Sequence, residues 1–289
     1  MILGLAWAAW GNNIGAAGLV DDTEPLFAEA ARQMVETGDW LTPQFNAQPR
    51  FDKPALIYWI VATSLRVFGT HVWAARLPSA LAAAAFALAL FATVRRFGLV
   101  PDPERAGAGG AGRWSQAAQA AAVWCMSPLV FIWGSTALSD MLLCTTMGGT
   151  LLAWFHAYAG AKEAPPRGRW GYPAAAVLCG LAVLTKGPVG LALPGAAVVL
   201  FLAYTGELWR VVTREIPFLS AGATFLATSA PWYVAMAAVH GKMYLATFFG
   251  YHNWERYTKG VNHHGNRPRW YPLAMIMGGY FPWSLCLPA

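Results

Sequence analysis

The sequence predicts an all-α polytopic membrane protein, in which a bundle of transmembrane helices carries further helices on its external side. Three observations lead to this prediction. The chain is 57% hydrophobic and only 12% charged, which excludes an ordinary soluble domain. Lys186 is the only charged residue between Tyr172 and Tyr204, and so long an apolar stretch is typical of membrane spans. Many of the basic residues gather in short connections between such stretches, as loops at one membrane face do.

The first part of the chain is expected outside the bilayer. Residues 23–37 place apolar side chains on one face and charged ones on the other, which predicts an amphipathic helix that begins at Asp22 or Thr23 and ends at Gly38. We expect this helix to lie flat on the membrane surface. A polar loop follows, and then an apolar helix over 54–69. At about 24 Å this second helix is shorter than the ~30 Å hydrocarbon core, so we expect it to pack against the bundle.

Longer apolar stretches are expected to cross the membrane at about 76–97, 116–134, 138–159, 171–185, 188–205, 214–239 and 270–288. The fourth and fifth stretches are separated at Gly187-Pro188, because Gly followed by Pro interrupts a helix. Residues 1–10 are apolar, and the chain stops within another apolar run. We therefore expect a single, partial transmembrane domain over 1–289, cut from a longer protein at both ends.

Clustered basic residues predict which connections face the cytoplasm. The clusters contain Arg95, Arg96, Arg105 and Arg113, then Lys162, Arg167 and Arg169, and then Arg210 and Arg214. The positive-inside rule assigns these connections to the cytoplasm. The external side then receives the helices and loop of 21–70, the turns at 134–140 and 185–188, and the loop 240–269. Regions far apart in sequence thus deliver carboxylates, lysines and histidines to one external site.

Two lysines are candidate ligands for a phosphate. A lysine at membrane depth costs at least ~2.5 kcal/mol, so Lys186 needs an anionic partner, a wet cavity or a helix break. Lys53 and Lys186 could together neutralise the charge that grows as a lipid phosphate leaves. The alternative for Lys53 is an interfacial lysine that reaches the headgroups. Arg256 is a further candidate for the phosphate, or a partner in a loop salt bridge.

Three aspartates are candidates for the reacting centre. Asp21 and Asp22 could supply the general base for an acceptor hydroxyl or phosphate, or they could cap the helix that follows. Asp140 begins a predicted span on the external side. It could lie at the same centre or serve only as a helix cap.

A divalent metal cation is a further hypothesis. Glu24, Asp52, His252, His263 and His264 have side chains of the types that bind such ions. Their spacing matches no standard zinc motif, and the alternative is a set of solvated loop residues.

Neither a nucleotide cofactor nor a nucleic acid is expected. The sequence G-x-G-x-x-G at 107–112 follows no predicted strand and lies in a linker, which argues against a dinucleotide site. The net charge of +6 comes from loop residues that form no basic stripe. Contact with anionic membrane lipids explains this charge better.

Several motifs occur in the order seen in one superfamily. They are Asp21-Asp22-Thr23-Glu24-Pro25, Gly38-Asp39-Trp40, Phe51-Asp52-Lys53-Pro54-Ala55, Ala75-Arg76-Leu77-Pro78, the turn Leu184–Pro188 and Phe281-Pro282-Trp283. In this the chain resembles the bacterial aminoarabinose lipid A transferases (ArnT-like) and the dolichyl-phosphate-mannose protein mannosyltransferases of family 39. The chain departs from the family pattern at Asp52, where Glu is usual, and at Ala55, where Pro is usual.

The resemblance implies a GT-C fold with a membrane-embedded cavity that opens to the periplasm. It further implies that Lys53 and Lys186 hold the phosphate of a polyprenyl-phosphate sugar, and that Asp140 lies near the sugar or the acceptor. The choice among Asp21, Asp22 and Glu24 for the catalytic position stays open.

The function expected on this basis is a glycosyltransferase of the plasma membrane, with its site on the external face. It would move a sugar from the polyprenyl-phosphate donor to a lipid A-like, protein or glycan acceptor in a single displacement that inverts the anomeric carbon. The alternatives are a membrane transporter of an anionic substrate, whose broken helices would place charges at mid-membrane, and an inactive fragment of the transferase.

Overall fold

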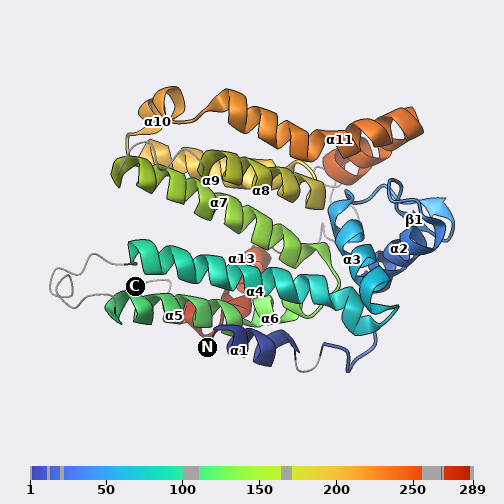
Figure 1. Cartoon of the computed structure of the whole chain (residues 1–289), viewed down its shortest axis with the longest axis horizontal. Helices are drawn as coiled ribbons and strands as arrows, with labels where there is room; N and C mark the ends of the chain where they lie inside the picture. The colour runs from blue at the N-terminus through green and yellow to red at the C-terminus, as the bar shows by residue number, and fades with distance from the viewer. Residues whose placement is uncertain are drawn as a thin grey trace.

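The structure, a computed structural model, describes residues 2–11, 14–19, 23–99, 111–163, 171–255, 268 and 270–286. Long helices lie side by side and run between two ends of the molecule (Figure 1). One end carries helices α2 (Glu24–Thr37) and α3 (Leu56–Phe68), and it is called the α2 end below. The opposite end carries the short helix α10 (Leu208–Arg214) and is called the α10 end.

Helix α2 forms where the amphipathic pattern predicts it. Thr23 is its N-cap residue, and Gly38 ends it with a φ of 74° and an N–H that donates to the carbonyl of Met34. Its apolar residues Phe27 and Met34 are buried in a cluster with side chains of α3. The expectation that this face lies on the membrane surface is therefore wrong, because α3 covers it. Helix α3 packs against its neighbours and is too short to span, as predicted.

A small hairpin connects α2 to α3. The strands β1 (Gln44–Phe45) and β2 (Gln48–Pro49) pair antiparallel. The two residues between them, Asn46 and Ala47, have positive φ angles of 51° and 58°, as the tight turns of two-residue hairpins require. The hairpin reverses the chain and returns residues 50–53 to the start of α3.

Helix α4 (Val72–Phe97) confirms the first predicted span. By length and apolar composition it is the one described helix able to cross a membrane on its own. Helices α5 (Ala111–Met126) and α6 (Pro128–Gly134) qualify together but are bent by 65°. The segment predicted as a span over 116–134 thus consists of two helices with a sharp bend between them. Proline has no backbone N–H and its ring crowds the preceding turn, which explains the break before Pro128.

The next three helices surround the lysine turn. Helix α7 runs from Ser139 to Glu163, and α8 (Gly171–Lys186) and α9 (Val189–Tyr204) have 16 residues each. The predicted break is confirmed, since Gly187 has a φ of 81° between α8 and α9. These two helices reach only about 24 Å each, shorter than a full span. They pack closely, because a Cβ on Gly190 would lie 2.4 Å from the carbonyl carbon of Ala182.

The last part of the chain differs from the expected pattern in three places. Helix α11 (Phe218–Leu245) begins four residues later than the predicted span at 214, and Gly241 interrupts it with a φ of 56°. The predicted loop 240–269 is helical at its start, where η3 (Ala246–Glu255) follows α11. The predicted span 270–288 contains α13 (Tyr271–Gly279) and the short η5 (Trp283–Cys286) instead of one long helix.

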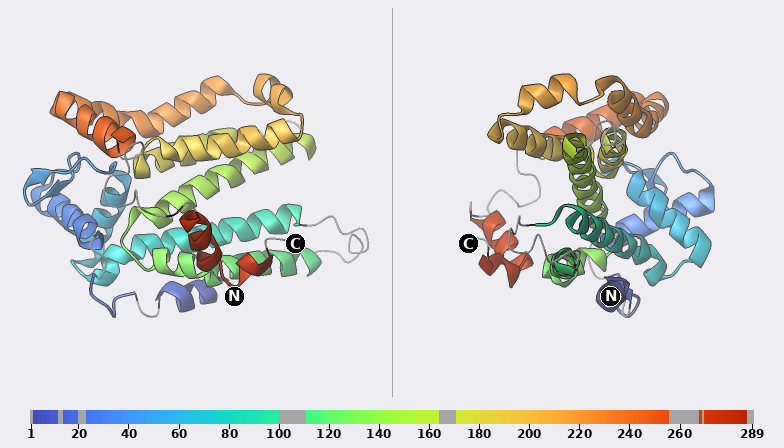
Figure 2. Two further views of the ribbon diagram at one scale, coloured as in Figure 1. Left: turned by 180° about the vertical axis from the view of Figure 1, so that it is seen from behind. Right: turned by 60° about the vertical axis from the view of Figure 1, so that its left-hand side comes forward.

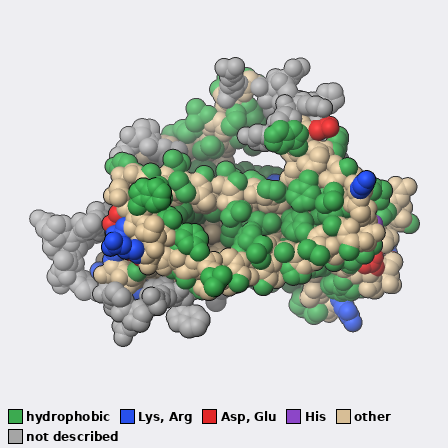
Figure 3. All heavy atoms as spheres, turned by 90° about the horizontal axis from the view of Figure 1, so that it is seen from above, with side chains coloured by type: hydrophobic (Ala, Val, Ile, Leu, Met, Phe, Trp, Pro, Cys, Tyr) green, Lys and Arg blue, Asp and Glu red, His purple; other side chains and the backbone are tan. Residues whose placement is uncertain are grey.

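Described helices near the two ends of the chain both contact α6. Helices α1 (Ile2–Ala6) and η1 (Trp7–Gly11) pack against α4, α5 and α6, and α13 contacts α6 (Figure 2). Figure 3 shows the face formed by the helices at the top of Figure 1, seen from above. Apolar side chains cover much of this face, while charged ones gather toward its two ends. Leu193 and Leu200 of α9 and Val234 of α11 are 55%, 70% and 66% exposed. Such a surface suits contact with lipid.

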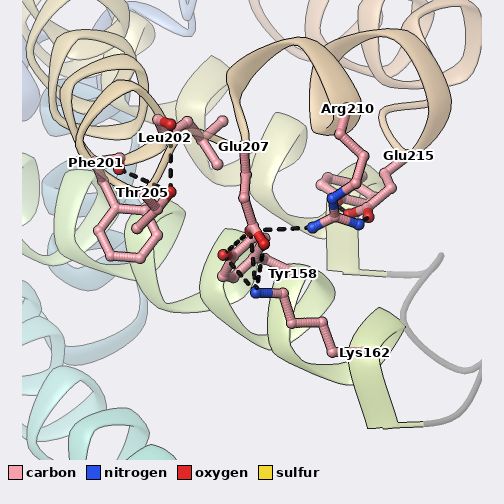
Figure 4. Close-up of polar contacts among 9 residues, drawn as sticks. Tyr158, Lys162, Phe201, Leu202, Thr205, Glu207, Arg210 and Glu215 are labelled. Carbon is pink, nitrogen blue, oxygen red and sulfur yellow. Dashed lines mark hydrogen bonds and ion pairs between the residues drawn. The ribbon is translucent and has the colours of Figure 1, made fainter.

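Ion pairs join the helices at the α10 end (Figure 4). Glu207, just before α10, accepts a hydrogen bond from Tyr158 and pairs with Lys162 at 3.0 Å. Arg210 pairs with Glu207 at 3.0 Å and also with Glu215. The network connects α7 to the segment between α9 and α11. The hydrogen bond from Tyr158, with further help from Lys162 and Arg210, lowers the pKa of Glu207 from 4.5 to about 2.

This pKa predicts a pH-dependent stability. A carboxylate whose pKa is lowered by folding stabilises the protein above its unfolded pKa, and the effect is lost as the pH falls toward its folded pKa. We expect Glu207→Gln to lower the melting temperature modestly at pH 6, because Glu207 is partly exposed and its pairs are screened by water. The difference from the wild type should shrink between about pH 4.5 and pH 2. Thermal unfolding in detergent measures it, and a constant difference across this range would contradict the assignment.

Candidate functional site

A cavity of about 780 Å³ lies at the α2 end. Its walls come from the start of α2, the segment before α3, the start of α7, the turn between α8 and α9, and η3. Five of the predicted site residues line it, namely Asp52, Lys53, Asp140, Lys186 and His252. Sequence positions far apart in the chain thus meet around one space.

Lys186 and Asp140 form an ion pair across the cavity wall. The Lys186 Nζ atom lies 2.6 Å from Oδ1 of Asp140, and the two side chains are 32% and 37% exposed. Lys186 is the last residue of α8, and Asp140 is in the first turn of α7. The ammonium group carries three N–H donors, so the pair leaves donors for a ligand. The structure therefore gives Lys186 an anionic partner, a helix break and a cavity together.

The turn after Lys186 is held in place by η3. Gly187 has a φ of 81°, and its N–H donates to the carbonyl of Val183 at 2.8 Å. A Cβ at Gly187 would lie 3.1 Å from the ring of Phe248 and 3.4 Å from the side chain of Asn253. The positive φ and this close packing both favour glycine here. His252 and Asn253 of η3 line the same cavity.

Asp52 is paired with an arginine on the other wall. Its Oδ1 and Oδ2 atoms accept hydrogen bonds of 2.6 Å each from Nε and the Nη2 group of Arg50. The Tyr58 hydroxyl donates to Oδ1 at 3.1 Å. Burial raises the pKa of Asp52, but the hydrogen bonds and charge of Arg50 outweigh this effect, and the pKa stays below its ordinary range. Asp52 is therefore a carboxylate at neutral pH.

Lys53 lies beside this pair at the rim of α3. Its Nζ atom is 3.4 Å from the backbone carbonyl oxygen of Asp52, and its side chain lines the cavity. Among the described lining residues, Arg50, Lys53 and Lys186 are cationic, and Asp52 and Asp140 are anionic. Each carboxylate is already paired with a cation, so the described wall is suited to a ligand that carries negative charge.

Glu24 has a partner outside the cavity. Its two oxygens accept hydrogen bonds from Nε and the Nη2 group of Arg76 at 2.7 and 2.8 Å, and the backbone N–H of Ala137 donates at 2.8 Å. Arg76 also donates to the backbone carbonyls of Ala17 and Gly18. Glu24 is only 1% exposed. It joins α2 to α4 and to the turn before α7.

The described members of the predicted metal set do not fit a metal site. Both oxygens of Glu24 bind Arg76, and both oxygens of Asp52 bind Arg50. The described part of the chain contains no group of three or more His, Cys, Asp or Glu side chains able to hold an ion. His263 and His264 lie outside the described residues, so the metal hypothesis stays a prediction.

Three further candidates also lie outside the described residues, namely Asp21, Asp22 and Arg256. Their neighbours in sequence are informative. Thr23, which follows Asp22, lines the cavity. The helix η3 ends at Glu255, directly before Arg256, and two of its residues line the cavity. The roles predicted for these three residues remain predictions.

Sequence reasoning assigned no role to Arg50 or Arg76. Arg76 stands near the start of a long apolar helix, and a lone charge in such a position signals a buried partner. Arg50 stands two residues before Asp52. In an extended segment, residues i and i+2 lie on the same face, and this spacing was the signal for the pair.

The chain matches a known protein family. Residues 52–100 and 113–234 match the family described as dolichyl-phosphate-mannose-protein mannosyltransferase. Asp52, Lys53, Asp140 and Lys186 all fall within the matched segments.

Curated relatives cover nearly all of the chain. An undecaprenyl phosphate-alpha-4-amino-4-deoxy-L-arabinose arabinosyl transferase of Shewanella sediminis is 30% identical over 96% of the chain and 47% of its own length. The enzyme of the same name from Edwardsiella ictaluri is 29% identical over 92% of the chain and 44% of its own length. The chain thus spans about half the length of these relatives.

The fold also matches a solved structure. The crystal structure of ArnT from Cupriavidus metallidurans bound to undecaprenyl phosphate superposes with a TM-score of 0.85 and 26% identity. The match covers 99% of the chain and 49% of the other protein. The chain therefore has the helical GT-C membrane fold that the family resemblance implied.

The Glu24–Arg76 pair yields a stability prediction. Removing one partner of a buried ion pair leaves the other charge uncompensated, at a cost of about 3–5 kcal/mol. We expect Glu24→Ala to lower the melting temperature strongly or to prevent folding. Glu29→Ala, which removes a partly exposed carboxylate from the same helix, should have a small effect. Thermal unfolding of the purified variants measures both, and equal melting temperatures for the two variants would contradict the structural role of Glu24.

Proposed function

The chain belongs to the dolichyl-phosphate-mannose-protein mannosyltransferase family, and on this premise we propose that it is a polyprenyl-phosphate-dependent glycosyltransferase. The observation that carries the proposal is the cavity at the α2 end, where Lys53, Lys186 and Asp140 meet. A sugar would pass from a polyprenyl-phosphate carrier to an acceptor in this cavity.

The donor phosphate would bind the two lysines. The donor named for the curated relatives is an undecaprenyl-phosphate sugar, and the related crystal structure contains undecaprenyl phosphate. Both lysines line the described cavity, and Lys186 is oriented by its 2.6 Å contact with Asp140. Lysine is a common phosphate ligand that acts as a compact charge.

The lysines would also favour the chemical step. The bond between the anomeric carbon and the phosphate oxygen breaks, while the acceptor oxygen forms a new bond to that carbon from the opposite side. The phosphodiester carries one negative charge, and the released phosphomonoester carries up to two. Fixed cations that face this growing charge stabilise the transition state more than the ground state.

An aspartate would accept the proton of the acceptor. Asp21 or Asp22 is proposed as this base, because they are the two residues that precede Thr23, which lines the cavity. Asp140 is proposed to lie near the sugar or the acceptor while it holds Lys186. Arg256 is proposed as a further phosphate ligand, because it follows η3 in the sequence.

The cavity is proposed to open on the external face of the plasma membrane. The described basic residues of the predicted cytoplasmic connections belong to elements that meet at the α10 end. Arg113 donates to the backbone carbonyl of Arg96, and Lys162 shares the ion-pair network with Arg210. The positive-inside rule assigns this end to the cytoplasm. The cavity lies at the opposite end.

Loss of either lysine should slow the reaction strongly. We expect Lys186→Ala and Lys53→Ala to lower the rate of sugar transfer by about 100-fold or more, the size of effect seen when a transition-state charge contact is removed. Lys242→Ala removes an exposed lysine of α11 and should leave the rate unchanged. Transfer of radiolabelled sugar from undecaprenyl-phosphate-aminoarabinose and from polyprenyl-phosphate-mannose measures the rates. Wild-type rates in both cavity variants would contradict the phosphate role.

The same assay separates the alternatives. Appearance of label in lipid A, in protein or in another glycan identifies the acceptor class by mass spectrometry of the envelope. Uptake of the donor into vesicles without covalent transfer would indicate a transporter instead. Binding of undecaprenyl phosphate without transfer or uptake would identify the chain as the donor-binding part of a longer enzyme.

A further inference from the structure

Arg50 is the third cation among the described residues of the cavity wall, beside Lys53 and Lys186. The proposed function gives it no role. It stands between the hairpin and α3, where its N–H donates to the carbonyl of Pro43 at 2.7 Å. Its side chain is 15% exposed and lines the cavity. The guanidinium carbon lies 5.6 Å from the centre of the Phe27 ring. The hairpin and α2 thus fix where this side chain can lie.

Asp52 and Tyr58 fix the orientation of the guanidinium plane. Nε and the Nη2 group of Arg50 donate to the two oxygens of Asp52 at 2.6 Å each. Nε also lies 3.2 Å from the Tyr58 hydroxyl oxygen. A bidentate pair of this kind sets both the position and the plane of an arginine. Arg50 is therefore held rigid before any ligand binds.

The same pairing leaves one edge of the guanidinium available. Arginine carries five N–H donors in a planar fork. Within the described part of the chain, the hydrogen bonds of Arg50 use Nε and the Nη2 group, and the Nη1 group makes none. A preorganised donor in a cavity that already holds two lysines is suited to an anionic oxygen.

We propose that Arg50 is a binding residue for the donor phosphate, oriented by Asp52 and Tyr58. This inference rests on the proposed function, which supplies the phosphate. It assigns Asp52 the task of positioning an arginine, in place of the metal ion predicted for it from sequence. Arg50 would donate from its Nη1 group to a phosphate oxygen, beside the ammonium group of Lys53.

The competing explanation is that Arg50 only balances the charge of Asp52. The two explanations differ when both charges are removed together. If Arg50 serves only the pair, the double variant Arg50→Gln with Asp52→Asn has no uncompensated charge and should bind the ligand like the wild type. If Arg50 contacts the phosphate, the double variant stays weak. Comparison of the single and double variants isolates this contribution.

The experiment measures binding of undecaprenyl phosphate to the whole chain in lipid nanodiscs. We expect R50Q and R50Q/D52N to lose at least about tenfold in affinity, the size of one charge-assisted hydrogen bond. R50K keeps the charge but not the planar fork, and it should bind between the wild type and R50Q. R66Q removes an exposed arginine from the last turn of α3 and should bind like the wild type. Thermal unfolding shows that each variant is folded.

Two results would overturn the inference, and they have different meanings. Wild-type affinity in R50Q/D52N would show that Arg50 serves only Asp52, while the proposed function would stand. Absence of undecaprenyl phosphate binding by the wild type would overturn the role of Arg50 together with the proposed donor. If R50Q fails to fold, the double variant and R50K still decide the question. The double variant has no carboxylate at position 52, and R50K keeps a cation beside Asp52.

Discussion

The architecture of the site depends on the ion pair between Lys186 and Asp140. A charge within an apolar bundle must have a partner or water, because the cost of leaving it bare is several kcal/mol. The pair meets this requirement where the ends of α7 and α8 come together at the cavity. Gly187 ends α8 at that point, and Phe248 packs against the turn. The helix break at Gly187-Pro188, the ion pair and the cavity together accommodate one lysine in an apolar segment.

A second ion pair, which is buried, joins this bundle to the segment that covers it. Arg76 of α4 holds Glu24 of α2, and Glu24 in turn accepts the N–H of Ala137 just before α7. The start of α2 is therefore fixed relative to the start of α7, and Thr23 and Asp140 reach the same cavity. The charged residues that the sequence marked as candidates therefore differ in role. Glu24 holds structural elements together, whereas Lys53, Asp140 and Lys186 line the cavity.

Much of the site was predictable because its signals are local. Lys186 stood out by its apolar surroundings in the sequence. Gly187-Pro188 predicted the turn because Gly followed by Pro interrupts a helix whatever the tertiary fold. Glu24 and Asp52 were different, because their carboxylates have the same chemistry whether they bind a metal or an arginine. For Glu24 the sequence could not decide between these partners, since Arg76 is 52 positions away. For Asp52 a local signal existed, since Arg50 is only two positions away. The apolar face of α2 was likewise compatible with lipid or with α3.

By itself, the sequence determined the helical class, the position of the break at Gly187, the amphipathic helix up to Gly38 and the set of charges able to face a phosphate. Each follows from a property of adjacent residues, such as the missing N–H of proline or the period of an α-helix. Only the tertiary structure decided the angle of the bend before Pro128, the helical start of the segment after His240, and the partners of Glu24 and Asp140. Partner choice depends on which helix ends meet in space, and packing of the whole bundle sets that.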